Sequence, residues 1–232
     1  MRRLIYVPIV HTAADMGSQA EAMEREHVRR LGRGEWARTR RLIDEVWEGL
    51  RTRLLALDLD YRRVRIYQDG LPVCGRELDI VREVARGGSR NYALILELLD
   101  RGTEVEGTES PGLLREEYER IRSAIPKESA PRGRMRTGEL DAKAESRKAG
   151  SPDQAREECA REGERILRQR DEFIGRRIDE TLKEGEVGIL FIGLMHRVDR
   201  FLAPDIEVQY LIHRLPFQIP PGDPRPRTRH GG

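Results

Sequence analysis

Two histidines, near opposite ends of the chain, each follow an apolar segment that is typical of a buried β-strand. His11 comes after residues 4–10 and His196 comes after residues 187–195, and a carboxylate follows each histidine, at Asp15 and Asp199. Apolar strands from distant parts of a chain usually become neighbours in one buried sheet, so the residues beyond their ends meet in space. Imidazole is both a common metal ligand and a common general base. The pattern therefore predicts a functional site where these two strands end.

Carboxylates follow the other strand-like segments. Asp69 comes after residues 63–68, and Glu109 comes after residues 103–107, a segment that also contains Glu106. In open α/β sheets, ligands bind beyond the carboxyl ends of the strands. Two histidines and a carboxylate suit a divalent transition metal with open positions, but the same residues could perform general acid–base chemistry without a metal. A single histidine after a strand is more often structural, so it is the coincidence of four strand ends that favours a site.

Arg170 occupies a place in the otherwise apolar row of a long helix. The other members of that row are Ile166, Ile174, Ile178 and Leu182. A buried guanidinium without a partner would cost several kcal/mol, so we expect an anion beside it. That anion is either a structural carboxylate, Asp69 or Glu109, or an anionic part of a substrate. Asp171 and Asp199 have weaker claims to a role in the site, as solvated or capping residues.

Alternating strands and helices surround these candidates. Strands are expected at residues 3–10, 63–68, 103–107, 187–193 and 207–212. Helices are expected up to about Leu57, with two tryptophans as core anchors, then at 76–86, 91–101, from 110 to before Pro126, and from 152 to about 183. The order indicates an α/β fold with a largely parallel central sheet of about five strands flanked by helices. Only a dozen residues separate the last two strands, which leaves open an antiparallel last strand.

The chain is expected to form one α/β domain over residues 1–215. Residues 127–153 contain only Met135 and Leu140 as large aliphatic side chains, which predicts a mobile insertion. Residues 216–232 are rich in proline, which predicts a disordered tail.

Composition excludes several classes of protein. The 43 basic residues, only four of them lysines, are interleaved with 41 acidic residues, and the net charge is +2, which makes nucleic acid an unlikely partner. The mean hydropathy is -0.67, and no apolar run approaches the roughly 18–20 residues of a membrane span. The first apolar segment is too short for a signal peptide, and two cysteines make no disulfide framework, so the cytoplasm is the expected location. No phosphate-binding loop, dinucleotide motif or nucleophile elbow is present.

The last third of the chain carries a recognisable pattern. An Arg170-Asp171 pair on a helix precedes a strand that ends in Gly193-Leu194-Met195-His196, and the first strand ends in Pro8-Ile9-Val10-His11. This pattern resembles the TraB/TIKI and ChaN-like group of the erythromycin-esterase-like superfamily. That group has a Gly-x-x-His at both places and a glutamate where this chain has Asp69. The resemblance implies metal-dependent peptidase, histidine-dependent esterase or ligand-binding activity, since the group contains all of these. Function must therefore be argued from the site.

The sequence predicts a hydrolase of an ester, amide or peptide bond, with a small molecule or a peptide as substrate. His11, His196, Glu109 and Arg170 are the expected catalytic residues, with Glu109 as general base. His11, Asp69 and His196 are the expected ligands of a divalent metal such as Mn, Co or Zn. The alternatives are a non-catalytic ligand-binding or regulatory module on the same fold and, more remotely, an interaction protein. The hydrolase hypothesis and the ligand-binding hypothesis both require the nearest ring nitrogens of His11 and His196 to lie within about 8 Å of each other.

Overall fold

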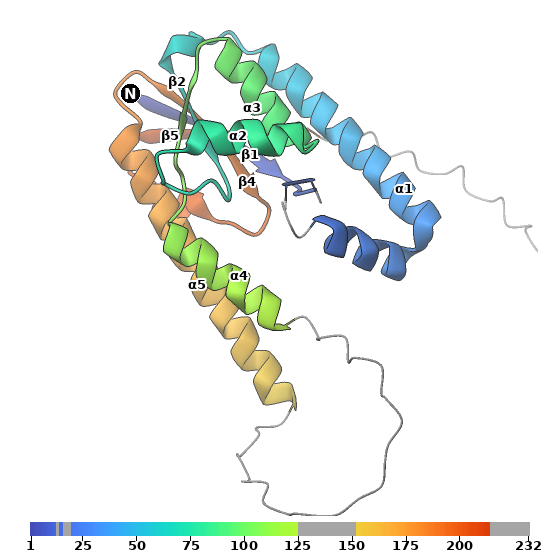
Figure 1. Ribbon diagram of the computed structural model, residues 1–232. Helices are drawn as coiled ribbons and strands as arrows, with labels where there is room; N and C mark the ends of the chain where they lie inside the picture. The colour runs from blue at the N-terminus through green and yellow to red at the C-terminus, as the bar shows by residue number, and fades with distance from the viewer. Residues whose placement is uncertain (13, 16–19, 125–151, 214–232) are drawn as a thin grey trace, which may run out of the picture.

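A computed structural model describes residues 1–12, 14–15, 20–124 and 152–213 (Figure 1). The strands are β1 (Arg2–Ile9), β2 (Val64–Gln68), β3 (Glu104–Glu106), β4 (Val187–Gly193) and β5 (Ile206–Tyr210). The α-helices are α1 (Ala20–Leu55), α2 (Glu77–Arg86), α3 (Arg90–Asp100), α4 (Pro111–Ala124) and α5 (Pro152–Thr181), and two 3-10 helices are η2 (Tyr61–Arg63) and η3 (Val198–Phe201). The expected α/β fold is confirmed.

The five strands form one sheet in the order β3-β2-β4-β1-β5, and every neighbouring pair is parallel. β5 is therefore parallel, and the antiparallel alternative left open by the short connection is wrong. Twelve residues join β4 to β5, and in extended form they reach about 40 Å, whereas a seven-residue strand is only about 23 Å long. The connection can thus return to the start of the sheet with a single turn of helix, η3.

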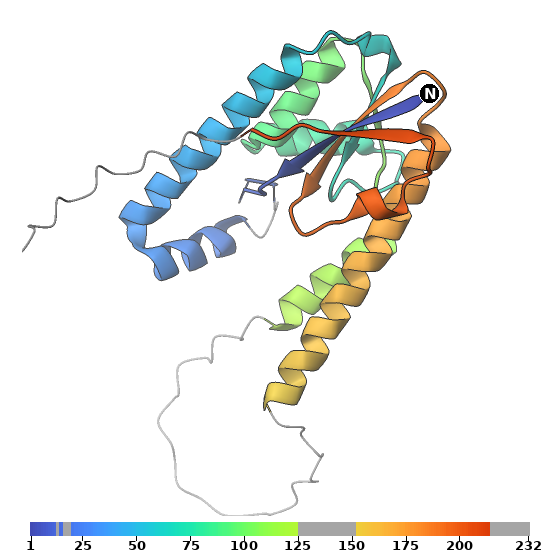
Figure 2. The same ribbon diagram turned by 180° about the vertical axis from the view of Figure 1, so that it is seen from behind.

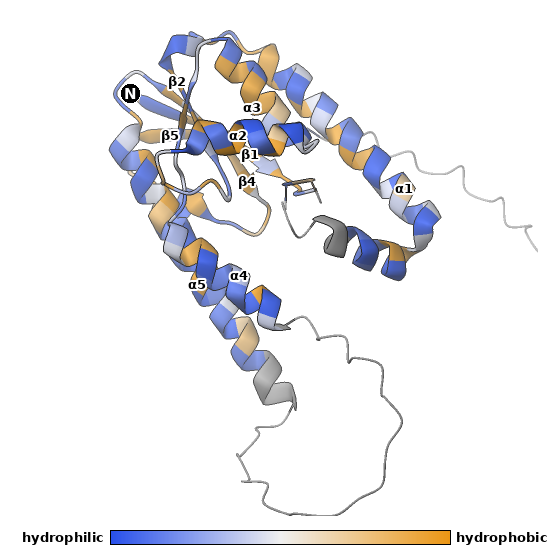
Figure 3. Ribbon diagram, viewed as in Figure 1, coloured by the Kyte–Doolittle hydropathy of each residue, from blue (hydrophilic) through white to orange (hydrophobic). Residues whose placement is uncertain are grey.

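Alternate residues of the strands face two separate cores. On one face, Ile5 and Val7 of β1 pack with residues of α1, α2 and α3, including Leu50, Val81 and Ile95. On the other face, the buried residues of the sheet pack with those of α5 and η3: Leu4, Tyr6, Tyr67, Leu190 and Ile192 with Ile174, Ile178, Leu182 and Val198. Figure 2 shows this second face, with α5 and η3 in front of the sheet. The hydrophilic residues gather on the outer surfaces of α1, α4 and α5 (Figure 3).

α1 changes direction at Gly32, whose φ of 79° and ψ of 157° are not helical. The part of α1 after the break places Trp47 in the core that contains Ile5 and Val7, as expected. Trp36 instead stacks on His27, with ring centroids 4.6 Å apart, and its Nε1 lies 3.4 Å from Glu24 Oε1. Trp36 is also buried, at 9 % exposed, but it lies outside the two clusters described above, because the break at Gly32 folds the first arm of α1 back over its ring.

Two expectations about chain organisation fall largely or wholly on residues that the structure does not describe. The predicted insertion at about 127–153 has only its last two residues described, where α5 begins, and the predicted tail at 216–232 lies outside the described residues. Within the described ranges, no helix is both long and apolar enough to cross a membrane.

Candidate active site

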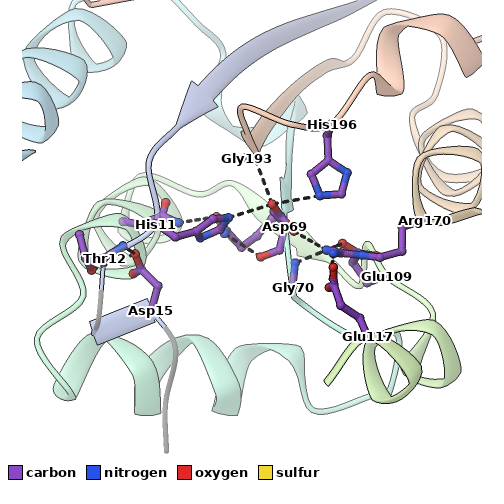
Figure 4. A network of polar contacts seen from close by, with 12 residues as sticks. His11, Thr12, Asp15, Asp69, Gly70, Glu109, Glu117, Arg170, Gly193 and His196 are labelled. Atoms are coloured by element: carbon purple, nitrogen blue, oxygen red, sulfur yellow. Dashed lines mark hydrogen bonds and ion pairs between the residues drawn. The ribbon is translucent and has the colours of Figure 1, made fainter. Parts of the chain in front are cut away.

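The parallel sheet brings four strand ends to one edge, as expected. His11 follows β1, Asp69 follows β2, Glu109 lies three residues after β3, and His196 lies three residues after β4. The middle three strands, β2, β4 and β1, are neighbours, so the side chains that follow them converge (Figure 4).

Asp69 lies at the centre of the converging side chains and is only 5 % exposed. Its Oδ2 accepts a hydrogen bond from the backbone N–H of Gly193 at 2.9 Å and lies 2.9 Å from His11 Nε2. His196 Nε2 lies 3.5 Å from the same oxygen. Because both ring nitrogens approach the same oxygen atom, they lie within about 8 Å of each other, as the sequence predicted. The predicted proximity of the two rings is confirmed.

Gly193 has a steric reason to be glycine. A Cβ atom at this position would lie 2.9 Å from Asp69 Oδ2 and 3.2 Å from His11 Nε2. Any larger residue would therefore push apart the groups that meet there. The glycine of the Gly-x-x-His pattern thus keeps space for the contact between Asp69 and His11.

His196 is held by the carboxylate of Asp171, for which the sequence suggested a solvated or capping role. Asp171 Oδ1 lies 2.6 Å from His196 Nδ1, and Asp171 Oδ2 accepts a hydrogen bond from the backbone N–H of Arg197 at 2.9 Å. Asp171 is 4 % exposed, so it is neither solvated nor a surface cap. Its place directly after Arg170, on the face of α5 that meets the sheet, was the signal in the sequence.

The ring of His196 thus lies between two carboxylates, Asp171 at Nδ1 and Asp69 at Nε2. A neutral imidazole carries one proton, so one of its nitrogens would present a lone pair to a carboxylate oxygen. The arrangement is favourable when Nε2 carries a second proton or binds another cation.

Arg170 pairs with carboxylates through all of its guanidinium nitrogens. Nε and NH2 donate to Glu109 at 3.1 and 2.6 Å, NH2 also donates to Asp69 Oδ1 at 2.7 Å, and NH1 donates to Glu117 of α4. The anion expected beside Arg170 is therefore structural, and both carboxylates named in advance, Asp69 and Glu109, contribute. Glu117 was missed, because α4 carries charged residues on most of its surface.

Glu109 is fully buried, and both of its oxygens accept from Arg170. Its Oε1 also accepts from the backbone N–H of Gly70 at 3.3 Å. These contacts engage the carboxylate with the protein, so its position favours holding Arg170 over the general-base role expected from the sequence.

The buried side-chain amides of Gln68 and Asn91 form hydrogen bonds that hold the backbone at Asp69. Gln68 Nε2 donates to the Asp69 carbonyl at 2.9 Å, and Asn91 Nδ2 donates to Gln68 Oε1 at 2.9 Å. Both amide side chains are completely buried. They fix the peptide at the end of β2, and nothing in the strand pattern marked either of them.

The contacts shift the pKa values of the central groups. Burial disfavours the charged form of His11, but the hydrogen bond to Asp69 together with the negative charges of Asp69 and Asp15 outweighs this effect and raises the pKa of His11 above its ordinary value. For His196, burial is likewise outweighed by Asp171 and by the charge of Asp69, so its pKa is also raised. Burial opposes ionisation of Asp69, yet the neighbouring positive groups hold its pKa well below its usual range. Burial raises the pKa of Glu109 despite Arg170.

The other two carboxylates near the histidines have different surroundings. Asp15 accepts from Thr12 Oγ1 at 2.9 Å and from Ser89 Oγ, which also caps α3, so Asp15 ties the loop after β1 to that helix. Asp199 forms a side-chain hydrogen bond with Tyr210. It therefore contacts β5 instead of the group around Asp69.

Among the described residues, Asp69, Glu109 and His196 form a buried group whose possible ligand atoms lie within 4.8 Å of one another. This group shares Asp69 and His196 with the predicted metal ligands and has Glu109 in the third place. His11 contacts Asp69 from the more open side, where its side chain is 33 % exposed.

Comparisons with known proteins give no further guide to identity. No protein-family model, no curated protein and no solved structure matches the chain.

Proposed function

We propose that the chain is a hydrolase of an ester, amide or peptide bond, and that His11, Asp69 and His196 are the centre of its active site. The observation that carries the proposal is the approach of two imidazole nitrogens, from different strand ends, to one buried carboxylate oxygen. We also propose, on the strand-end histidines and the Arg170-Asp171 pair, that the chain belongs to the TraB/TIKI and ChaN-like group.

A divalent metal ion fits the buried group of Asp69, Glu109 and His196 in its donor chemistry. The group and its immediate partners Asp171 and Glu117 supply four carboxylates against the single fixed positive charge of Arg170, so a further cation is electrostatically favoured. Asp171 behind His196 matches the carboxylate that usually orients a metal-binding histidine. When bound, such an ion lowers the pKa of a coordinated water and polarises a carbonyl oxygen.

His11 is the group best placed to move a proton. Its ring is part exposed, and Asp69 fixes its Nε2, so Nδ1 is the atom that accepts a proton from the attacking water. Asp69 orients the ring and stabilises the imidazolium that forms, as a buried aspartate does in a catalytic triad. Arg170, held by Glu109 and Glu117, keeps Asp69 ionised and in place.

The test is turnover of an ester and peptide library by the full chain, together with the metal content of the purified protein. Replacing His196 by alanine should abolish turnover and metal binding. The matched control is His213→Ala, because His213 follows β5 and lies in none of the contacts around Asp69 that the structure describes. This control should keep both properties.

Two outcomes would contradict the proposal. Turnover that survives in the His196 variant would remove the histidine from the mechanism. A wild-type chain that binds metal but hydrolyses nothing would instead be the ligand-binding module of the alternative reading.

A further inference from the structure

We infer that the substrate carries an apolar group next to its scissile bond, and that Val10, Leu194 and Met195 bind that group. The inference rests on the proposed hydrolase function and deepens it, because it names the class of substrate that the same site accepts. It is carried by the exposure and the position of three apolar side chains.

Leu194 and Met195 occupy the two corners of a β-turn. The Gly193 carbonyl accepts a hydrogen bond from the His196 N–H at 3.0 Å, which closes the turn. Such corners usually carry glycine, proline, asparagine, aspartate or serine. Here they carry two large apolar side chains in residues that are 66 % and 76 % exposed. Apolar side chains stabilise a fold by being buried, so this pair contributes little to stability where it lies.

Val10 adds a third exposed apolar side chain to the same edge of the sheet. It is 45 % exposed and comes directly after β1. The register pairs Ile9 of β1 with Gly193 of β4, so Val10 and Leu194 are the next positions beyond a pair of adjacent strands. Val10 and Met195 also directly precede the two histidines of the site. The three residues are therefore neighbours of the two histidines along the chain, at one edge of the sheet.

Other exposed apolar residues give the contrast. Leu31 and Leu42 lie on α1 and Leu78 lies on α2, helices that supply no side chain to the contacts described above around Asp69. Single apolar residues scattered on a surface are normal and need no explanation. Tyr210 and Ile212 are also exposed, at the end of β5 and just beyond it. Val10, Leu194 and Met195 are distinguished by lying in the short segments that join β1 and β4 to the two histidines.

The size of this surface favours a substrate group over a larger partner. A stable complex between proteins buries about 800 Å² on each partner, from some 20–30 residues. Three side chains offer much less than that, but they are enough to cover an acyl chain or an aromatic ring. The occupant we propose is therefore an alkyl or aryl group of an ester or amide.

The test uses p-nitrophenyl esters of acetate, butyrate, hexanoate and octanoate with the full chain. We expect kcat/KM to rise roughly two- to fourfold for each methylene added over the first few carbons. The double variant Leu194→Ser, Met195→Ser should lose most of this dependence, so that the ratio of its kcat/KM for the octanoate to that for the acetate falls toward one. Leu42→Ser and Leu78→Ser are matched controls and should keep the wild-type dependence.

A second measurement keeps the inference independent of turnover. Equilibrium binding of the corresponding carboxylates, acetate to octanoate, should tighten with chain length and lose that trend in the double variant. If this happens without hydrolysis of any ester, the apolar site stands and the hydrolase proposal fails. If neither rates nor binding depend on chain length, the inference is wrong even when the chain is a hydrolase.

Two other occupants would show themselves in the same variants. Size-exclusion chromatography would reveal a dimer that Leu194→Ser, Met195→Ser dissociates, and flotation with phosphatidylcholine vesicles would reveal lipid binding that these changes abolish. Either result, with no effect of the variant on chain-length dependence, would overturn the assignment of this surface to substrate.

Discussion

Replacing Arg170 by methionine removes the positive charge around which the buried carboxylates are arranged. The side chain of Arg170 is 6 % exposed, that of Asp69 is 5 % exposed and that of Glu109 is fully buried. Without the guanidinium, two carboxylates stay buried without their partner, and breaking such a buried pair costs about 3–5 kcal/mol. For a chain of this size the melting temperature should fall by about 6–20 °C.

Arg165→Met is the matched control for this experiment. Arg165 also pairs with two glutamates, Glu116 and Glu162, but its side chain is 40 % exposed. Exposed pairs of this kind contribute little to stability, so the control should be close to wild type. The assay is urea and thermal unfolding at pH 7 in the presence of a chelator. An Arg170 variant that is no less stable than the Arg165 variant would refute the structural role of the buried pairs.

Arg170→Met should also change how the free energy of unfolding depends on pH. In the wild type, the lowered pKa of Asp69 contributes stability above the pKa of the unfolded chain, and this contribution is lost as pH falls. In Arg170→Met, the folded-state pKa of Asp69 should rise above its unfolded value, and that of Glu109, which burial already raises, should rise further. The penalty of burying both carboxylates is therefore largest at high pH and shrinks as they take up protons. The difference in unfolding free energy between variant and wild type should therefore narrow from pH 7 to pH 5. A constant difference would contradict this account.

Three further changes test the surroundings of Asp69. Gly193→Ala places a Cβ 2.9 Å from Asp69 Oδ2 and should cost about 1–3 kcal/mol in unfolding, whereas Gly112→Ala, whose Cβ meets only Ser110 Oγ at 3.6 Å, should cost much less. Asp171→Asn should weaken metal binding about 10- to 100-fold by calorimetry, because it replaces the charged carboxylate beside His196 Nδ1 with a neutral amide; unchanged affinity would exclude this role. The raised pKa of His11 contributes stability that is complete below the unfolded value of about 6.5 and is lost as pH rises through the folded value. His11→Gln should therefore flatten the fall in stability of the metal-free chain as pH rises above about 6.5, as measured by urea unfolding.

The strand ends could be predicted from the sequence because the signal there is strong and local. Continuous apolar segments mark the buried parallel strands, and polar residues such as His11, Asp69 and His196 stand out where those segments stop. Arg170 was found for a related reason, since a charge in an apolar helical row must be paired. Its carboxylate partners followed from the same argument.

The supporting residues could not be predicted in the same way. Asp171 and Glu117 lie on helices rich in charged residues, where a carboxylate that faces inward has the same sequence signature as one that faces water. Gln68 and Asn91 are buried amides whose partner is set only when β2 and α3 come together. The direction of β5 depended on the path of one short connection, and the place of Trp36 depended on the break at Gly32.

The measurement that tests the central claim most directly uses an ester that the wild-type chain hydrolyses. Its hydrolysis by the chelator-treated chain is followed as Mn²⁺, Co²⁺ or Zn²⁺ is added. We predict that turnover appears and saturates at one ion per chain, and that Asp69→Asn, which preserves the shape of the side chain, shows no turnover with any of these ions. Turnover that persists in Asp69→Asn would contradict the assignment of Asp69 as the centre of the site.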